Sequence, residues 1–273
     1  MLGEDFWRSG QLLLKLKIAS ACLHMGATLG KQSNEMAVRD LIRRMHPRTP
    51  AHQLIRIGGA NDGGYLLPDD IEGIVACFSP GVGSTATFEE DMIERQVPCF
   101  LADASVEAPF DHALVNFEKK FIGVTHSETA TTLDEWVARC APPEGDLLLQ
   151  MDVEGAEWPS LLNTTEHTLR RFRIIVMEMH DLDQLLDRVG FSLIGNALDR
   201  LLFDFDVVHI HPNNSAGCVN KKEIVLPRVM EATFLRKDRA KSNGFSSQFP
   251  HPLDMPNTTE LRDIILPDIW RGE

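Results

Sequence analysis

Residues 74–92 read IVACFSPGVGSTATFEEDM, a strand, a glycine loop and the start of a helix in one stretch. The apolar run at its start is typical of a buried strand, and a helix is expected through residues 87–96. Gly81 and Gly83 lie between the two elements, where glycine permits a tight turn and the helix start offers unpaired N–H groups. This unit predicts the first strand of an α/β sheet, with a ligand at its carboxyl end.

The same alternation continues along the chain. Four more strands are expected at 98–105, 121–127, 146–153 and 173–180, each followed by a helix, at 111–120, 132–140, 158–172 and 182–204. Five short apolar strands alternating with helices predict a parallel sheet covered on both faces.

Beyond residue 205 two strand runs, 205–214 and 223–237, follow each other with only a polar loop between them. A short connection joins antiparallel strands, whereas a parallel pair needs a long crossover. The predicted fold is therefore α/β, with a mostly parallel seven-stranded sheet that ends in an antiparallel hairpin. Upstream, residues 54–71 place Asn-Asp-Gly-Gly between two apolar runs, which predicts a hairpin or tight turn.

These patterns divide the chain into three parts. We expect a helical N-terminal extension over residues 1–50, the α/β domain over 51–241 and an irregular C-terminal tail over 242–273. Residues 11–29 are apolar but are interrupted by Lys15 and Lys17, so an amphipathic or interfacial helix is expected rather than stable membrane insertion. A signal or anchor is the alternative for that segment.

The composition excludes some partners. The 27 basic and 40 acidic residues give a formal net charge of −13, which repels phosphate backbones and argues against nucleic acid as the main partner. The five cysteines are scattered and never spaced as CxxC, a pattern that favours reduced thiols and a cytoplasmic location.

Asp103 ends the second predicted strand, 22 positions after Gly81, where a carboxylate can accept hydrogen bonds from ribose hydroxyls. The loop, this aspartate and the strand alternation together predict a nucleoside-containing cofactor. They do not choose between NAD and S-adenosylmethionine. A dinucleotide fold has six parallel strands and often a separate substrate domain, whereas five strand–helix units closed by an antiparallel hairpin are the class I methyltransferase arrangement.

Several segments within roughly residues 55–238 resemble, by their sequences and their order, the FkbM-type methyltransferases. The most specific pieces are DVEGAE (152–157) and HPNN (211–214). The similar segments are CFSPGVGSTATFEEDM (77–92), LADAS (101–105), TLDEW (132–136), LLLQMDVEGAEWPSLL (147–162), IIVMEMH (174–180), VHIHPNN (208–214) and PRVMEATFLR (227–236). The resemblance implies a Rossmann-like class I methyltransferase with S-adenosylmethionine on Gly81, Gly83 and Asp103. Because several relatives methylate sugar hydroxyls, it also implies a small carbohydrate acceptor.

Two carboxylates are expected to meet beside the cofactor. Asp152 ends the fourth strand and Glu178 lies near the end of the fifth, and these strands are neighbours in the class I order. Carboxylate oxygens suit Mg²⁺ or a similar ion, which would lower the pKa of an acceptor hydroxyl. Relatives can carry an adjacent Glu-Asp pair, but here Met179 follows Glu178, so the choice of third ligand between His180 and Asp181 stays open.

His180, beside this edge, is the first candidate for the general base, and Asp152 is assigned a catalytic role with it. His209 and His211 are further candidates. Glu89, Glu154 and Glu157 are interpreted as acidic residues of first helical turns, and Tyr65 as a packing residue. Asn213 and Asn214 lie just beyond His209 and His211.

Two rival functions remain at this point. One is an NAD(P)-dependent oxidoreductase, favoured by the GxGxxA spacing of residues 81–86. The other is a non-catalytic relative that uses the fold as a cofactor-binding scaffold. The sequence does not determine the oligomeric state.

Overall fold

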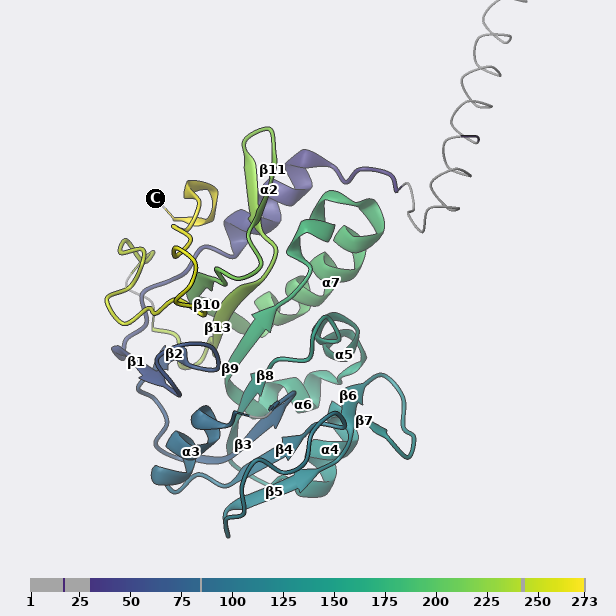
Figure 1. The fold of residues 1–273 in the computed structure, drawn as a ribbon, viewed down its shortest axis with the longest axis vertical. Helices are drawn as coiled ribbons and strands as arrows, with labels where there is room; N and C mark the ends of the chain where they lie inside the picture. Colours follow the sequence, from purple (N-terminus) through teal and green to yellow (C-terminus); the bar gives the residue numbers. More distant parts are fainter. Residues whose placement is uncertain (1–16, 18–29, 84, 242–243, 273) are drawn as a thin grey trace, which may run out of the picture.

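The computed structural model describes residue 17 and residues 30–83, 85–241 and 244–272. Its centre is a mixed seven-stranded sheet in the order β10-β13-β9-β8-β3-β4-β5 (Figure 1). The strands are β3 (Ile74–Pro80), β4 (Cys99–Ala102), β5 (Val115–Glu118), β8 (Asp146–Met151), β9 (Phe172–Met179), β10 (Phe205–Pro212) and β13 (Met230–Arg236). Strands β5, β4, β3, β8 and β9 pair in parallel, and β13 runs antiparallel to both of its neighbours.

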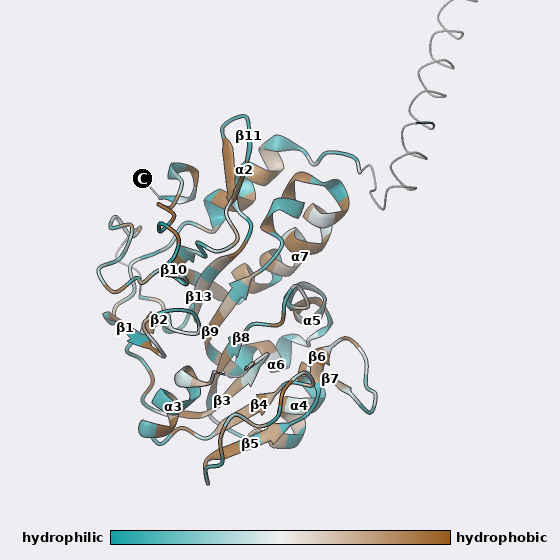
Figure 2. Cartoon of the chain, viewed as in Figure 1, coloured by the Kyte–Doolittle hydropathy of each residue, from teal (hydrophilic) through white to brown (hydrophobic). Residues whose placement is uncertain are grey.

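Alternate residues of the central strands enter two separate cores, as the two-residue period of a strand requires. On β3, Phe78 belongs to one core and Cys77 to the other. The first core is covered by α2 (Glu35–Arg44), α4 (Leu133–Cys140), α5 (Glu157–Asn163), α6 (Glu166–Arg171) and α7 (Arg188–Asp204) (Figure 1). The second is covered by α3 (Thr87–Glu94) with β1 (Leu54–Ile57) and β2 (Tyr65–Pro68). Figure 2 shows apolar residues concentrated in the central strands. The sheet is therefore buried on both faces.

The segment after β4 differs from the prediction. Residues 111–120 were expected to be helical, but they contain β5, which pairs in parallel with β4 at the edge of the sheet. Val115 and Phe117 alternate toward the second core, and Asn116 between them is exposed. Because only two apolar side chains carry this period, the local pattern was too short to distinguish an edge strand from a helix.

The next predicted strand also has a different place. Within residues 121–127, β6 (Phe121–Gly123) forms, but it pairs with β7 (Ala130–Thr132) in a separate two-stranded sheet. The main sheet therefore takes its edge strand from residues 115–118 instead, and no helix connects β4 to β5 in the described structure.

Side-chain caps divide two of the predicted helices. Residues 158–172 form α5 and α6, because the Thr165 side chain accepts a hydrogen bond from Thr168 N–H and starts a new helix. Residues 182–204 form the 3-10 turn η1 (Leu182–Leu186) and then α7, whose cap is Asp187. The prediction of helical structure is confirmed for both segments, but each segment contains two helical elements instead of one.

The predicted turn in residues 54–71 is confirmed as a hairpin. Strand β1 (Leu54–Ile57) pairs antiparallel with β2 (Tyr65–Pro68), and the Asn-Asp-Gly-Gly sequence lies in the loop between them. The hairpin packs against the sheet near β9, β10 and β13. It therefore forms part of the wall at the carboxyl edge of the sheet.

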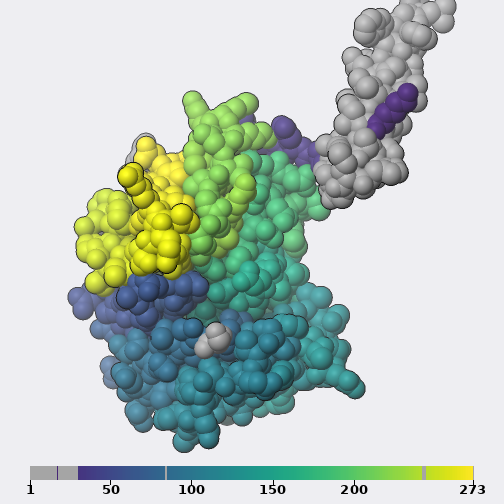
Figure 3. Space-filling model, in the orientation of Figure 1, coloured from purple at the N-terminus to yellow at the C-terminus, as the bar shows by residue number. Residues whose placement is uncertain are grey.

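The connection from β10 to β13 is more than a polar loop. It contains β11 (Cys218–Lys221) and β12 (Ile224–Pro227), which pair with each other outside the main sheet. The tail follows β13 and has the 3-10 turn η2 (Asp268–Trp270). It contacts β1 through Leu253 and Arg56 and β10 through Asp254 and His209, and Figure 3 shows it beside the segment that contains β1 and β2.

Within the N-terminal extension expected over residues 1–50, the structure has the helix α2. Residues 1–16 and 18–29, which include most of the segment predicted to be an amphipathic or interfacial helix, lie outside the described residues. Within the described part of the chain, no helix is long and apolar enough to cross a bilayer. The four cysteines in that part (Cys77, Cys99, Cys140, Cys218) carry free thiols, and Cys22 lies outside it.

Candidate functional site

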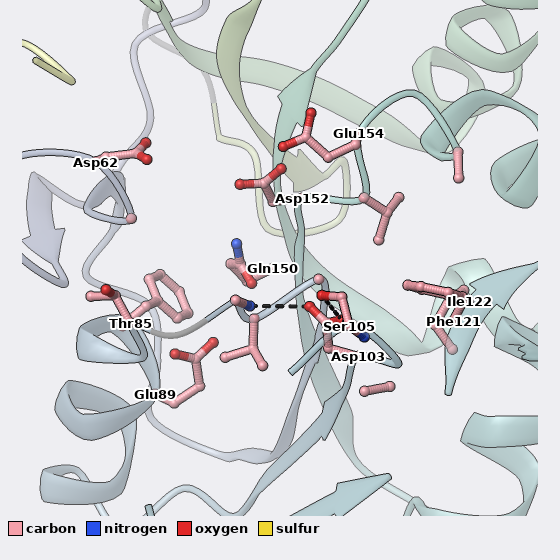
Figure 4. Close-up of a pocket in the computed structure, with 18 of the residues that line it drawn as sticks. Asp62, Thr85, Glu89, Asp103, Ser105, Phe121, Ile122, Gln150, Asp152 and Glu154 are labelled. Carbon is pink, nitrogen blue, oxygen red and sulfur yellow. Dashed lines mark hydrogen bonds between the residues drawn. The ribbon is translucent and has the colours of Figure 1, made fainter. Parts of the chain in front are cut away.

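A cavity of about 610 Å³ opens at the carboxyl ends of β3, β4 and β8 (Figure 4). Four predicted site residues line it: Gly81, Gly83, Asp103 and Asp152. The other lining residues are Asp62, Gly63, Tyr65, Val82, Thr85, Phe88, Glu89, Ala102, Ser105, Phe121, Ile122, Gln150, Val153, Glu154 and Ala156. Residues from five separate parts of the sequence thus enclose one space.

The glycine loop is held tightly against the end of β8. Gly81 has φ +82°, and a Cβ at this position would overlap the carbonyl oxygen of Asp152. The Gly81 N–H donates to Ala102 O (2.9 Å), and Asp152 N–H donates to Pro80 O (3.2 Å). The ends of β3, β4 and β8 are therefore fastened together. Gly83 has φ +59° and no atom within 4 Å of its Cβ direction.

Asp103 lies at the cavity wall and is almost completely buried. Its Oδ2 accepts a hydrogen bond from Gly83 N–H (3.2 Å), and its Oδ1 accepts from Ser105 N–H (2.7 Å) and Ser105 Oγ–H (2.6 Å) (Figure 4). These donors orient the carboxylate and connect it to the glycine loop. Asp103 can thus present its remaining lone pairs to hydroxyl groups of a ligand.

A second group of side chains lies beside the cavity. Asp152, Glu178 and His180 offer ligand atoms that all lie within 4.8 Å of one another. His180 Nε2 is 3.3 Å from Glu178 Oε2 and 3.9 Å from Asp152 Oδ1, and its Nδ1 is 3.0 Å from Glu157 Oε1. Asp181 is not part of this group. Asp152 lines the cavity, whereas Glu178 and His180 are not among its lining residues.

The charges in this cluster are not balanced. Asp152 Oδ1 is buried and has no hydrogen-bond partner. Burial, and then the nearby Glu178 carboxylate, raise the pKa of Asp152 to about 8. Burial alone would lower the pKa of His180, but hydrogen bonds to Glu157 and Glu178 prevail and raise it to about 11. Without another cation, the cluster therefore retains protons at neutral pH.

Comparison with known families gives one match. Residues 82–202 match the family model of the methyltransferase FkbM domain. The match begins inside the glycine loop, ends in α7 and includes Asp103, Asp152, Glu178 and His180. It confirms the resemblance seen in the sequence and supports a methyltransferase. No curated protein matches the chain.

Beyond the matched segment, the HPNN motif connects that segment to the tail. Asn213 Nδ2 donates to Glu178 Oε1 (2.5 Å) and thereby orients that carboxylate. Asn214 Nδ2 donates to Thr258 O (2.8 Å) and Leu261 O (3.1 Å). One asparagine therefore supports the acidic cluster and the other holds the tail.

His209 and His211 have partners other than the cavity. His209 Nε2 lies 2.8 Å from Asp254 Oδ1, and His211 Nε2 lies 3.2 Å from Asp263 Oδ1. Both rings are buried, neither lines the cavity, and both of these carboxylates belong to the tail. Of the three histidines considered as bases, only His180 is adjacent to the cavity.

Sequence reasoning underestimated three residues of this cavity. Glu89 was read as part of an acidic helix start, but it is 2% exposed and lines the cavity. Gln150 was not considered, and Tyr65 was assigned to packing; both line the cavity, and Tyr65 is also buried. The signal that could have indicated the burial of Glu89 is its position directly after Phe88, since both residues are buried in α3.

The two glutamates of the DVEGAE motif also differ from each other. Glu157 is fully buried, where it accepts a hydrogen bond from Val153 N–H (3.0 Å) and contacts His180. Its side chain therefore closes the turn before α5, as a first-turn acid does, and additionally orients the histidine. The Glu154 side chain is largely exposed at the cavity rim, 3.4 Å from His180 Nε2.

Proposed function

We propose that this chain transfers a methyl group from S-adenosylmethionine to a hydroxyl group of a small carbohydrate or glycoside. The observation that carries the proposal is a cavity formed by a glycine loop and Asp103, directly beside the Asp152–Glu178–His180 cluster. Both features fall almost entirely within the FkbM match. The order of the sheet, with antiparallel β13 between β9 and β10, supports a Rossmann-like class I assignment rather than a dinucleotide fold.

The cofactor part of the proposal rests on Asp103 and the loop. Asp103 would accept hydrogen bonds from the ribose hydroxyls, and Gly81 and Gly83 allow the backbone to approach the ligand. S-adenosylmethionine would supply an electrophilic methyl group. Ile122 and Phe121 provide an apolar wall on the side of Asp103 away from Glu89, suited to a purine ring (Figure 4).

The residues of the cluster fit a divalent cation. Asp152 Oδ1 has no hydrogen-bond partner among the described residues, and Glu178 brings a second oxygen. The contact of Glu157 with Nδ1 of His180 turns Nε2 toward both carboxylates. Two carboxylates with an imidazole are acceptable ligands for Mg²⁺ or Mn²⁺. Bound there, the ion would lower the pKa of an acceptor hydroxyl. Asn213 would keep Glu178 in the required orientation.

Proton removal is proposed to involve Asp152 more directly than His180. A base must be unprotonated at the working pH, and the raised pKa of His180 makes it an imidazolium while no ion is bound. Asp152 lines the cavity, and its pKa of about 8 leaves it largely protonated at neutral pH while no ion is bound, so it would act as a base above that pH or once a bound cation holds it ionised. His180 then stabilises the carboxylates and orients them.

The charge of the cavity supports a neutral acceptor. Five lining residues are acidic (Asp62, Glu89, Asp103, Asp152 and Glu154), and among the described lining residues none is Lys or Arg. An acceptor with phosphate or carboxylate groups would be repelled. A polyhydroxyl compound such as a sugar would not be repelled and could form hydrogen bonds with several of these carboxylates.

The test is calorimetric titration of the purified protein with S-adenosylhomocysteine and with NAD, each with and without Mg²⁺. Micromolar binding of S-adenosylhomocysteine and none of NAD is the expected result, and it would justify an acceptor screen that begins with sugars. Binding of NAD alone would support an oxidoreductase. Binding of neither ligand would refute the proposal.

Turnover separates the enzyme from a cofactor-binding scaffold. Once an acceptor is found, Asp152→Ala should abolish methyl transfer to it. A scaffold would keep its function with this substitution.

A further inference from the structure

Glu89 is a buried carboxylate that faces the cavity. It lies in the first turn of α3, is 2% exposed and lines the cavity together with Phe88 (Figure 4). Burial raises the pKa of Glu89 to about 7, although a hydrogen bond from Ser79 opposes this. A carboxylate in such a position costs free energy unless it is paired, so its presence needs an explanation.

Within the described part of the chain, no residue supplies a cation to this carboxylate. Among the described residues, Glu89 forms no ion pair with Lys, Arg or His, and its side chain contacts the hydroxyl of Ser79. Buried carboxylates in folded proteins are usually paired with a cation or fully hydrogen-bonded. The missing positive charge can therefore come from a ligand in the cavity.

A chain of polar side chains holds Glu89 in place. Ser79 Oγ contacts the Glu89 carboxylate and also lies 2.5 Å from Gln150 Oε1, and Gln150 Nε2 lies 3.5 Å from the Tyr65 hydroxyl. These residues belong to β3, β8 and β2, three separate elements. A side chain supported from three elements is pre-organised for binding.

The cavity has three regions that follow one another in space. Figure 4 shows Phe121 and Ile122 at one end, Asp103 with Ser105 in the middle and Glu89 at the other end, with Gln150 and Asp152 above. S-adenosylmethionine has three parts in the same order, an apolar purine, a ribose diol and a methionine with an α-ammonium group. The α-ammonium group, in the last of these parts, is the one positive charge of the cofactor apart from the sulfonium. Glu89 is the acidic residue at the corresponding end of the cavity.

We propose that Glu89 binds the α-ammonium group of the methionine part of S-adenosylmethionine. This inference rests on the proposed function. The end of β3, Ser79-Pro80, has no acidic side chain, and Glu89 reaches the cavity from the following helix instead. The adjacent helix start has Ala86 at its cap, with no side chain bonded to the first N–H groups, so these donors can receive the methionine carboxylate.

The test combines a change in the protein with a change in the ligand. Binding of S-adenosylhomocysteine, and of its analogue lacking the amino group, is measured by calorimetry on the wild type, Glu89→Gln and Glu90→Gln. Removing the amino group should weaken binding to the wild type about tenfold to a hundredfold, the value of a charge-assisted hydrogen bond. Glu89→Gln should weaken S-adenosylhomocysteine similarly and should bind both ligands equally.

Glu90→Gln is the matched control, because Glu90 is the exposed neighbour in the same helical turn. It should retain the wild-type preference for the amino group. Wild-type protein that binds both ligands equally would refute the role of Glu89 while leaving the proposed function intact. This outcome is measured on the wild type alone and so does not depend on the folding of any variant. A Glu89→Gln variant that still prefers the amino group would also refute it. Wild-type protein that binds neither ligand refutes the proposed function itself.

Discussion

The Cα of Gly81 faces the carbonyl oxygen of Asp152 so closely that no side chain fits between them. This contact joins the loop proposed to hold the cofactor to the first residue of the acidic cluster. Any movement of one would move the other. The distance between methyl donor and acceptor site would thus depend on two backbone segments that are 71 positions apart in the sequence.

Gly81→Ala should destabilise the protein by at least about 3 kcal/mol, because the new Cβ overlaps backbone and the φ of +82° is unfavourable for alanine. Gly83→Ala is the matched comparison. It has a positive φ but open space, so a loss of about 1–2 kcal/mol is expected. Urea unfolding of both variants measures the difference. Equal losses would show that the close approach to Asp152 is unimportant.

Glu89→Gln should change the pH dependence of stability. Glu89 has an ordinary pKa of 4.5 when unfolded and about 7 when folded, so the folded state keeps a proton that the unfolded state has lost between these values. The wild type therefore loses stability as pH rises through this window, and glutamine does not. Relative to the wild type, the variant should gain roughly 2–3 kcal/mol between pH 5 and pH 8.

Urea unfolding at the two pH values measures this gain, and Glu90→Gln should show much less, because the Glu90 carboxylate is only a minor cause of the raised pKa of Glu89. The neighbouring Cys77 thiol does not interfere, because burial raises its pKa well above the ordinary value and it stays neutral throughout. A constant difference between Glu89→Gln and the wild type would mean that Glu89 does not titrate in this range.

The acidic cluster should make thermal stability depend on divalent ions. Mg²⁺ or Mn²⁺ at a hundred times its dissociation constant should raise the Tm of the wild type by roughly 5 °C relative to EDTA. Glu178→Gln should lose this increase, because one of the three proposed ligands is replaced. In EDTA the same variant loses both the repulsion between Glu178 and Asp152 and the ion pair of Glu178 with His180, so its Tm in EDTA is the reference for its own response to the ion.

Differential scanning fluorimetry measures both effects, and Glu166→Gln, at an exposed position remote from the cavity, should behave like the wild type. An increase in Tm that persists in Glu178→Gln would place the ion elsewhere.

Asn214→Ala should loosen the C-terminal tail. Asn214 donates to two tail carbonyls and accepts a hydrogen bond from Thr258 N–H (2.9 Å), so alanine leaves three backbone groups without this partner. A loss of about 1–3 kcal/mol is expected, with faster hydrogen exchange in residues 251–263. Asn220→Ala, at an exposed position of β11, is the control. Unchanged exchange in the tail would contradict this role.

Several features could be predicted from local sequence because they depend on local chemistry. The run at 74–80 forms β3, the Asn-Asp-Gly-Gly turn forms a hairpin, and Gly81 has the positive φ that glycine permits. Asp103 lies at the wall of the cavity, as its position after a strand indicated.

Other features required contacts that the local pattern does not contain. Strand β5 exists because Val115 and Phe117 pack beside β4, although the same residues also fitted a helix. His180, rather than Asp181, joins Asp152 and Glu178, because Glu157 holds the ring in place. Neither choice can be made from the order of residues alone.

The sequence by itself determined the elements and the residue types at the strand ends, because hydrophobic period and turn chemistry act over a few residues. Only the tertiary structure decided which carboxylates share an enclosed space and which have no partner there. Glu89 and Glu90 are adjacent and chemically identical, yet one is buried in the cavity and the other exposed. Burial and pairing set the charge of a group, and both depend on residues brought together from distant parts of the chain.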